Sequence, residues 1–469
     1  MASTKLEIVE RDEAGVVTAS YVESKSEKRS GGSRVDVILP AQTKSYAQQL
    51  LDVFLPAGYP QSVTEDYIQY QIYDSLQAFS SSIAGLLSSR AVLEAGVGVG
   101  DAMASPTAAL LLSVLQESMG RIATILFAHK LGTSLEPECK MYRLAADIFN
   151  DMAMVLDCLS PAFPRTVRVA VLSFSSVLRS LCGVCAGSSK ASLSAHFAKR
   201  GNLGELNAKD SSQETVISLL GMLTGSVVVS WVSSPLATWI TLITLLSVHL
   251  LTNYFAVTSV SLRTLNRQRA NIVLSHVLQS GAVLRPQQVS SLERIFERDG
   301  VLRWAADGDQ ILGRCCIGVT LSTLLARMGA SRRRTGSREL QDIKLSELMQ
   351  VYRDCAYILW YDRSEACIVL KDGASPSDQV TAWAQALLLA HRARRHVKAA
   401  KGPWEPNVGQ DDTSVSATEG GILAELRFTR KEASKMFDAH AGRLREAGWD
   451  LEIAALETKT GTRVEIESY

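Results

Sequence analysis

The chain is poor in charge, in proline and in cysteine relative to its length. Charged residues make up 21% of its 469 residues and hydrophobic residues 46%, a balance that excludes a wholly disordered chain. Its 12 prolines are about half of the average usage of roughly 5%, which favours long helices. Eight cysteines without a secretory signal do not form a disulfide scaffold. With 49 Lys and Arg against 48 Asp and Glu, the balanced charge argues against nucleic acid as a partner.

The N-terminal residues lack the features of a targeting segment. Glu7, Glu10 and Arg11 interrupt any apolar stretch, so the segment is too polar for a signal sequence and too acidic for a typical transit peptide. We therefore expect synthesis in the cytosol, and reduced thiols. Residues 1–40 are predicted to hold a small hairpin and a flexible linker: the two strands are Leu6–Val9 and Val16–Tyr21, and the linker is Ser24–Arg34.

An uncharged run is the strongest physical signal in the sequence. Thr215–Leu262 contains no Asp, Glu, Lys or Arg, and His249 is its only group that titrates near neutrality. One membrane span needs roughly 20 apolar residues, so the run is long enough for two. Ser233–Pro235 lies near its middle and predicts the turn of a helical hairpin. The alternative is a pair of core helices in a soluble bundle, but soluble helices seldom stay uncharged for so long.

Basic residues flank this run on both sides and predict its topology. By the positive-inside rule both ends lie in the cytosol, and the turn lies across or within the bilayer. The termini are then cytosolic as well. The flanking cations are Lys199, Arg200 and Lys209 before the run, and Arg263, Arg267 and Arg269 after it.

Apolar periodicity predicts further helices before the hairpin. Ile68 to Leu87 recur at steps of three and four, and Ser62 with Glu65 predicts a capping box at the start of that helix. Polar residues within Pro106–Ala128 favour a helix buried in a bundle over one that faces lipid. The other two predicted helices are Met141–Leu159 and Val167–Gly187.

The C-terminal part has a different pattern and predicts a small α/β module. The fold class is therefore mostly α: a membrane-associated helical domain, 41–285, followed by a smaller C-terminal α/β module, 286–469. A Gly-, Pro- and Ser-bearing stretch, 402–421, is predicted to be a mobile linker. The expected elements are helices Val289–Arg298, Ser375–Lys398 and Lys431–Ala447, and strands Tyr357–Tyr361, Ala366–Leu370, Leu451–Ala455 and Arg463–Ile466.

Motifs of enzyme chemistry are not found. The chain has no Walker-type phosphate loop, no H-E-x-x-H and no G-x-S-x-G. Gly96–Asp101 imitates part of a dinucleotide fingerprint, but the third glycine comes too early, so close packing is favoured. Cys182 and Cys185 have no second pair at zinc spacing and are interpreted as buried thiols. We predict no catalytic residue, no metal site and no cofactor.

One polar cluster lies on a predicted helix face. Arg143, Asp147 and Asp151 are spaced i, i+4, i+8, and Asn150 lies beside them. These residues form either an intrahelical ion pair with a helix-end carboxylate or the lining of a polar cavity, because ionisable groups beside a membrane span usually face protein or water.

A second polar cluster lies at the mouth of the uncharged run. Lys209, Asp210, Gln213 and Glu214 either cap the hairpin at the membrane interface or line a cavity.

Two positions within the run itself carry structural hypotheses. Gly221 and Gly225 are four apart, which allows two helix backbones to approach closely. This spacing supports helix packing without establishing dimerisation. His249 could titrate or bind a ligand, but an internally hydrogen-bonded histidine is favoured.

Several ungapped motifs, in order, resemble the root UVB sensitive (RUS) family. The resemblance is strong over 41–284 and weaker in the C-terminal module, at Lys371–Asp378. The motifs are Phe54–Val63, Asp66-Tyr67, Tyr70-Gln71, Asp74–Phe79, Gly96–Asp101, Arg143–Asp147, Asn150-Asp151 and Ala208–Thr215.

The resemblance implies a membrane-associated protein without an established enzymatic activity. Plant members are associated with UV-B-responsive root growth, vitamin B6 homeostasis and pairing between family members, which implies this chain or a relative as partner, beside the lipid bilayer. The motif residues Asp66, Tyr67, Tyr70, Gln71 and Asp74 thereby join the candidate cavity or interaction residues. The acidic N-terminus is unlike the plastid-directed form and suggests a fungal or animal-type member.

The sequence departs from the family pattern at two places. Tyr142 stands where the family often has Trp, and Gln116–Ser118 replaces an Arg-Asp-Gly run. The second departure argues against a charge-based role for the predicted helix Pro106–Ala128.

Three classes of function follow. The first is a non-catalytic membrane protein that acts through homo- or hetero-assembly of its helical domain. The second is a membrane carrier or binder of a small polar metabolite, with the polar clusters lining its cavity. The third is an enzyme, which the motif search disfavours.

Overall fold

A computed structural model describes most of the chain as two compact units. The first, here called the helical unit, lies within Met1–Arg121 and Leu144–Val260. The second, the C-terminal unit, lies within Ile122–Arg143 and Ser261–Tyr469. The described residues are 6–11, 17–25, 33–39, 53–94, 106–199, 201–331, 338–340, 343–362, 364–400, 421–459 and 461–466.

A three-stranded antiparallel sheet lies near the N-terminus. Strands β1 (Glu7–Arg11) and β2 (Val17–Lys25) form the predicted hairpin. Strand β3 (Ser33–Ile38) pairs with β2, from Ser20 opposite Ile38 to Lys25 opposite Ser33. The predicted linker Ser24–Arg34 is therefore wrong at both ends, because its polar residues continue β2 and begin β3.

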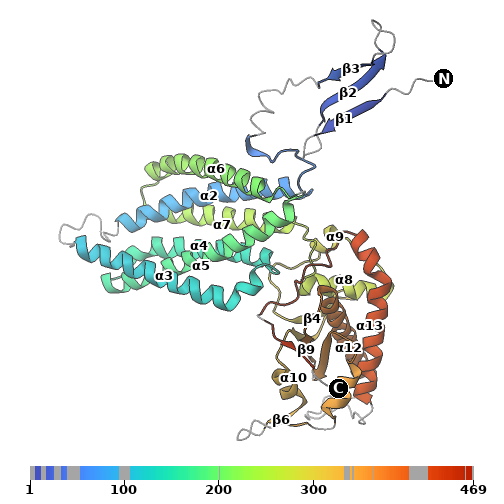
Figure 1. Ribbon diagram of the computed structural model, residues 1–469. Coiled ribbons are helices and arrows are strands. Elements are labelled where there is room, and N and C mark those ends of the chain that lie inside the picture. Colours follow the sequence, from blue (N-terminus) through green and yellow to red (C-terminus); the bar gives the residue numbers. More distant parts are fainter. Residues whose placement is uncertain are drawn as a thin grey trace. The chain divides into compact units, whose positions relative to one another are not determined.

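Six long helices are described before residue 260 and run side by side (Figure 1). Four of them lie wholly in the helical unit, whereas α3 and α4 each extend into the C-terminal unit. Helix α2 packs against both α6 and α7. It begins at Tyr67, so the predicted capping box of Ser62 and Glu65 is wrong: Ser62 lies in the turn before the helix. The elements are α2 (Tyr67–Glu94), α3 (Pro106–Leu135), α4 (Cys139–Leu159), a 3-10 turn (Ser160–Ala162), α5 (Arg165–Phe197), α6 (Leu203–Trp231) and α7 (Pro235–Ser259).

The predicted helical hairpin is confirmed. Helices α6 and α7 are separated by the short turn at 232–234, and Pro235 occupies the first turn of α7. The Ser234 hydroxyl accepts a hydrogen bond from the Ala237 N–H at 3.2 Å and so caps α7. Together with Thr166–Phe197 of α5, these are three helices long and apolar enough to cross a membrane. The helical unit thus has three candidate membrane spans, one more than the sequence predicted.

The outer faces of these helices are apolar and exposed. Leu223 in α6 and Ile240 in α7 expose more than half of their surface, which suits contact with lipid. Helix α3 contradicts the prediction that it is buried. Leu110 is 64% exposed and Ile125 66%, and the helix also exposes the ion pair of Glu117 with Arg121 at 3.5 Å.

A mixed sheet lies at the centre of the C-terminal unit. Strand β9 pairs in parallel with β5 and β10 and antiparallel with β8, and β4 pairs antiparallel with β5. Helices α8 and α12 pack against this sheet, and α13 packs on α12 (Figure 1). The strands of this sheet are β4 (Val301–Trp304), β5 (Gln310–Ile317), β8 (Tyr357–Asp362), β9 (Glu365–Lys371) and β10 (Arg463–Val464). Strands β6 (Gly329–Ser331) and β7 (Arg338–Leu340) pair with each other in a separate two-stranded sheet. The helices are α8 (Arg267–Ser280), α9 (Pro286–Ser290), α10 (Leu321–Met328), α11 (Leu345–Val351), α12 (Pro376–Ala400) and α13 (Gly421–Glu446).

Strands β8 and β9 and helix α12 confirm the sequence predictions, since β9 is a continuous buried apolar run. Helix α12 supplies Trp383, which is fully buried and donates its indole N–H to the Asn271 side chain at 2.9 Å. Helix α13 begins at Gly421, ten residues before the predicted start. The predicted helix Val289–Arg298 is wrong, because α9 ends at Ser290 and turns follow.

The predicted strand Leu451–Ala455 is also wrong, because this stretch contains bends and no strand. The motif Gly96–Asp101 and most of the predicted linker 402–421 lie outside the described residues.

Two of the cations used to predict topology are buried in the C-terminal unit. The first is Arg269, whose side chain is 2% exposed and lies 2.7 Å from the Glu293 carboxylate. Lys140, which was not used to predict topology, lies 2.5 Å from the same carboxylate. Arg267 pairs with Asp299. These guanidinium groups are therefore bound within the protein rather than facing lipid headgroups, and they lend no support to the positive-inside argument for this end of the hairpin.

Candidate functional site

A buried polar cluster, here called the core polar cluster, links α2, α4 and α7. It consists of Gln77, Asp147, Asp151, His249 and Asn253, each at most 6% exposed. The His249 Nδ1 lies 2.7 Å from Asp151 Oδ1, and Asn253 Nδ2 donates to Asp147 Oδ2 at 2.5 Å. Gln77 donates to the same Asp147 oxygen. The histidine in the apolar run is thus internally hydrogen-bonded, as the sequence favoured.

The imidazole lies between two carboxylates. Its Nε2 is 3.5 Å from Asp147 Oδ2 and 3.4 Å from Gln77 Nε2. The neutral ring donates through Nδ1 to Asp151, and its Nε2 then accepts from Gln77. A proton added at Nε2 would turn that nitrogen into a donor toward Asp147.

The sequence placed both carboxylates in one cluster but did not find their partners. Asn150 lies on the same helix and donates to Ser81 Oγ at 3.3 Å. Arg143 lies in the C-terminal unit, so the predicted cluster divides between the two units. Gln77 and Asn253 were not predicted. Asn253 carried a signal, since it is an amide in the uncharged helix α7, where a polar side chain needs a buried partner. Gln77 did not stand out, because α2 contains several other polar residues.

A second cluster, the α6 polar cluster, lies where α6 meets α2 and α5. It consists of Gln71, Lys190, Asp210, Gln213 and Glu214. The Asp210 carboxylate accepts from Gln71 at 2.8 Å through one oxygen and from Lys190 at 2.8 Å through the other. Lys190 also contacts Glu214 at 2.6 Å, and Gln71 donates to Gln213 at 3.0 Å. The sequence predicted these residues except Lys190, which comes from α5.

The same face of α6 holds the loop before α2. Glu205 accepts from the Ala57 N–H at 2.7 Å, Lys209 donates to the Val53 carbonyl at 3.0 Å, and Gln213 donates to the Phe54 carbonyl at 2.6 Å. Lys209 thus binds the backbone of this loop. This loop is the start of the FLPAGYPQSV motif, so α6 fixes the motif's conformation.

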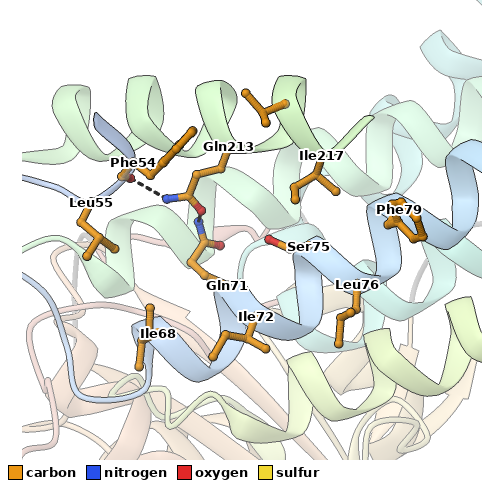
Figure 2. A pocket seen from close by; sticks show the side chains of 11 residues that line it. Phe54, Leu55, Ile68, Gln71, Ile72, Ser75, Leu76, Phe79, Gln213 and Ile217 are labelled. Carbon is orange, nitrogen blue, oxygen red and sulfur yellow. Dashed lines mark hydrogen bonds between the residues drawn. The ribbon is translucent and has the colours of Figure 1, made fainter. Parts of the chain in front are cut away.

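An apolar groove of about 550 Å³ lies beside these contacts, between α2, α6 and the loop. Figure 2 shows Gln71 and Gln213 meeting near Phe54, with the aliphatic side chains of both helices around the rest of the groove. Ser75 is the one other polar residue of its lining, which consists of Phe54, Leu55, Ile68, Gln71, Ile72, Ser75, Leu76, Phe79, Gln213, Val216 and Ile217.

The remaining motif residues at the start of α2 pack around α5. Asp66 Oδ2 lies 2.9 Å from His196 Nε2. Tyr67 and Tyr70 are buried against Phe197, with ring centroids 5.6 and 5.1 Å away. Asp74 is half-buried. Both tyrosine rings therefore take part in packing α2 against the end of α5.

Gly221 and Gly225 lie against α2 of the same chain. A Cβ at Gly221 would lie 2.6 Å from Ser82 Cβ, and one at Gly225 would lie 2.7 Å from Leu86 Cδ1. Close helix packing at these glycines is therefore present within the chain, where it occupies the surface that a helix dimer would need.

Metal-binding potential is low in the described part of the chain. No group of three or more His, Cys, Asp and Glu side chains there has an arrangement that could hold a metal ion.

Comparisons with known proteins place the chain in a family. Residues 40–281 match the family model described as "Vitamin B6 photo-protection and homoeostasis domain", and 302–460 match "Root UVB sensitive protein, C-terminal". No solved structure matches the chain.

Three relatives illustrate the similarity. RUS family member 1 of Dictyostelium discoideum is 41% identical over 251 residues, which is 53% of this chain and 47% of that protein. Protein root UVB sensitive 3 of Arabidopsis thaliana is 33% identical over 73% of this chain and 76% of its own length. Protein root UVB sensitive 2, chloroplastic, from the same plant is 25% identical over 74% of each chain.

The match to the Dictyostelium protein spans less than half of that relative, whereas the plant matches span about three quarters of theirs. None of these names states a reaction. Both family models match in the expected order, and the first covers the residues that carry the two polar clusters. The chain belongs to the root UVB sensitive family.

Proposed function

We propose that the helical unit is an integral membrane protein that binds and carries a small polar solute. The core polar cluster is the observation that supports this proposal: two carboxylates and a histidine are buried between helices whose outer faces are apolar. Ionisable groups at bilayer depth are costly, and in membrane proteins they mark solute and proton pathways.

The charge of the cluster favours a solute with a hydrogen-bond donor or a proton. Asp147 and Asp151 face a single imidazole, so the cluster contains more acidic than basic groups. Among the described residues, Asp151 Oδ2 is buried without a hydrogen-bond partner. A basic nitrogen, or a proton moved with the solute, would satisfy that oxygen.

The description of the matched domain selects the first solutes to test, because it names vitamin B6. Pyridoxine carries a ring nitrogen and hydroxyl donors, which have the required chemistry. The experiment is uptake of labelled pyridoxine and pyridoxal by vesicles reconstituted with the full chain, with and without a pH gradient.

Asp151→Asn and His249→Gln should abolish saturable uptake. Glu214→Gln is the matched control, since it removes an exposed charge from α6, and it should preserve uptake. The detergent melting temperature of each variant separates lost uptake from lost folding. Saturable uptake that persists in folded Asp151→Asn and His249→Gln variants contradicts the proposal, as does wild-type protein that neither binds nor moves these solutes.

A second candidate function is assembly of the helical unit with itself or with another family member. It is supported by α3, whose exposed leucines and isoleucines surround the exposed pair of Glu117 and Arg121. Such a mixed surface suits a protein partner better than lipid. Leu111→Ser with Leu115→Ser should convert a detergent-solubilised oligomer into a monomer by light scattering; an unchanged mass contradicts this function.

Activity as an enzyme is not proposed. The N-terminus is proposed to be cytosolic, as its composition indicates; three crossings by α5, α6 and α7 would then place the C-terminus on the opposite side, which corrects the expectation that both termini are cytosolic.

A further inference from the structure

The C-terminal unit contains a polar pocket of about 340 Å³ that the proposed function does not use. Its size is within the ~300–1,000 Å³ range of small-molecule sites. Five stretches of chain line it: the end of α3, the start of α4, the first turns of α8, the loop before β4, and Thr458 with Lys459. All of these lie in one compact unit.

The acidic side chains that line the pocket already have partners. Glu297 accepts from Arg303 at 2.9 and 3.1 Å, and Asp299 pairs with Arg267. Glu138 accepts from Asn266 at 3.0 Å, and burial raises the pKa of its carboxyl. These carboxylates therefore contribute little free negative charge to the pocket.

Three other basic side chains that line the pocket, here called the rim cations, lack such partners in the described part of the chain. Lys130, Arg298 and Lys459 line the pocket and are exposed. None of them forms an ion pair or side-chain hydrogen bond with another residue in the described part of the chain. Three cations at one opening repel one another, so an anion in the pocket would stabilise them.

The start of α8 and the loop that carries Arg298 have fixed positions in the pocket wall, and the start of α8 adds positive potential. Arg267 and Gln268, in the first turn of α8, contribute to its lining, and the N-terminus of a helix favours anions. Gly300 adopts φ +72°, and a Cβ there would lie 2.6 Å from the Cys315 carbonyl, so the loop carrying Arg298 is pinned against β5. Rigid placement of the donors lowers the cost of binding.

We propose that this pocket binds a small organic phosphate. A phosphate monoester carries close to two negative charges and three terminal oxygens. Lys130, Arg298 and Lys459 can each supply charged donors to those oxygens, and Arg can bind two of them at once. The uncharged lining includes Ser134, Asn271 and Thr458, whose hydrogen bonds to Tyr142, Trp383 and Asp299 fix their positions in the pocket wall.

The test measures binding to the full chain in detergent by calorimetry, at constant ionic strength. The probe is glycerol 3-phosphate, with glycerol as the uncharged control. The triple variant Lys130→Gln, Arg298→Gln, Lys459→Gln removes the rim cations. A matched triple variant, Arg427→Gln, Lys431→Gln, Arg443→Gln, removes the same charge from exposed positions of α13, outside the pocket.

We expect wild type and the α13 variant to bind glycerol 3-phosphate and not glycerol, and the rim variant to bind at least about tenfold more weakly. Absence of binding to wild type overturns the proposal. Equal weakening in both triple variants also overturns it, because net charge alone would then explain the binding.

A second arm distinguishes a soluble phosphate from a lipid headgroup. Vesicles of phosphatidylcholine with phosphatidic acid compete with glycerol 3-phosphate in the same titration. Competition by the vesicles that is lost in the rim variant supports the phosphate site with lipid as its source. No competition, with glycerol 3-phosphate binding intact, supports a soluble phosphate.

Discussion

The close approach of α6 to α2 predicts opposite effects of the same substitution at two glycines. In Gly221→Ala the new methyl group would lie 2.6 Å from Ser82 Cβ and 3.0 Å from the Phe79 carbonyl oxygen. Neither atom belongs to the flexible end of a long side chain, so the two helices must separate. Gly85 of α2 is the matched control, because a Cβ there meets nothing within 4 Å.

The magnitudes follow from two opposing contributions. Replacing a helical glycine with alanine stabilises the helix by roughly 0.5–1 kcal/mol. Overpacking a tight contact costs about 1–3 kcal/mol. Gly85→Ala should therefore raise the free energy of unfolding by roughly 0.5–1 kcal/mol. Gly221→Ala should lower it by about 1 kcal/mol or more.

The assay is unfolding of the purified protein in mixed detergent micelles, with the oligomeric mass measured on the same samples. Equal stabilisation by both substitutions would refute the packing of Gly221 on α2. A Gly221→Ala protein that keeps its stability but loses its oligomeric mass would show instead that this glycine packs between chains.

Further predictions concern charged side chains. Asp210→Asn should lower the free energy of unfolding by about 1–3 kcal/mol, because Lys190 and Gln71 share that carboxylate; Glu214→Gln, exposed, should change it by about 1 kcal/mol or less. An equal effect of the two in detergent unfolding would contradict the described contacts. Burial alone would raise the pKa of the Glu293 carboxyl, but the adjacent cations Lys140 and Arg269 outweigh burial, so its pKa is lowered. Its contribution to stability is therefore present above the ordinary carboxyl pKa and is lost as the pH falls through the lower folded-state value. Acid unfolding followed by tryptophan fluorescence should show this loss, and an acid-insensitive C-terminal unit would contradict it. Glu293→Gln should cost about 3–5 kcal/mol at neutral pH by the same assay, since it leaves two buried cations without their carboxylate.

The fold was predictable where one local signal dominates. The uncharged run and its Ser-Ser-Pro turn predicted α6 and α7, and the apolar run of β9 predicted that strand. Strands β4 and β5 were not predicted, although Asp307-Gly308 between them is a turn signal. Strand β4 has only four residues, and the sheet is completed by parallel pairing of β5 to β9, which is distant in sequence. Helix α8 was missed because its polar residues are buried, including Arg269, which removes the amphipathic pattern.

The sequence identified several residues of the site, but not which of them contact one another. Spacing on one helix placed Asp147 and Asp151 on a common face, and the uncharged run singled out His249. That these belong to one cluster depends on α4 packing beside α7, a tertiary contact with no local signature. Lys190 is a similar case: in sequence it is one lysine in a small-residue stretch of α5, yet it partners Asp210 and Glu214.

The central claim is that the helical unit lies within a membrane, and alkaline carbonate extraction of membranes from cells expressing the full chain tests it most directly. Carbonate releases peripheral proteins but leaves those whose helices cross the hydrocarbon core, where α5, α6 and α7 have the required length and apolar surface. We expect the protein to stay in the membrane pellet with an integral marker. Recovery in the supernatant with a peripheral marker would contradict it and would favour a soluble helical bundle.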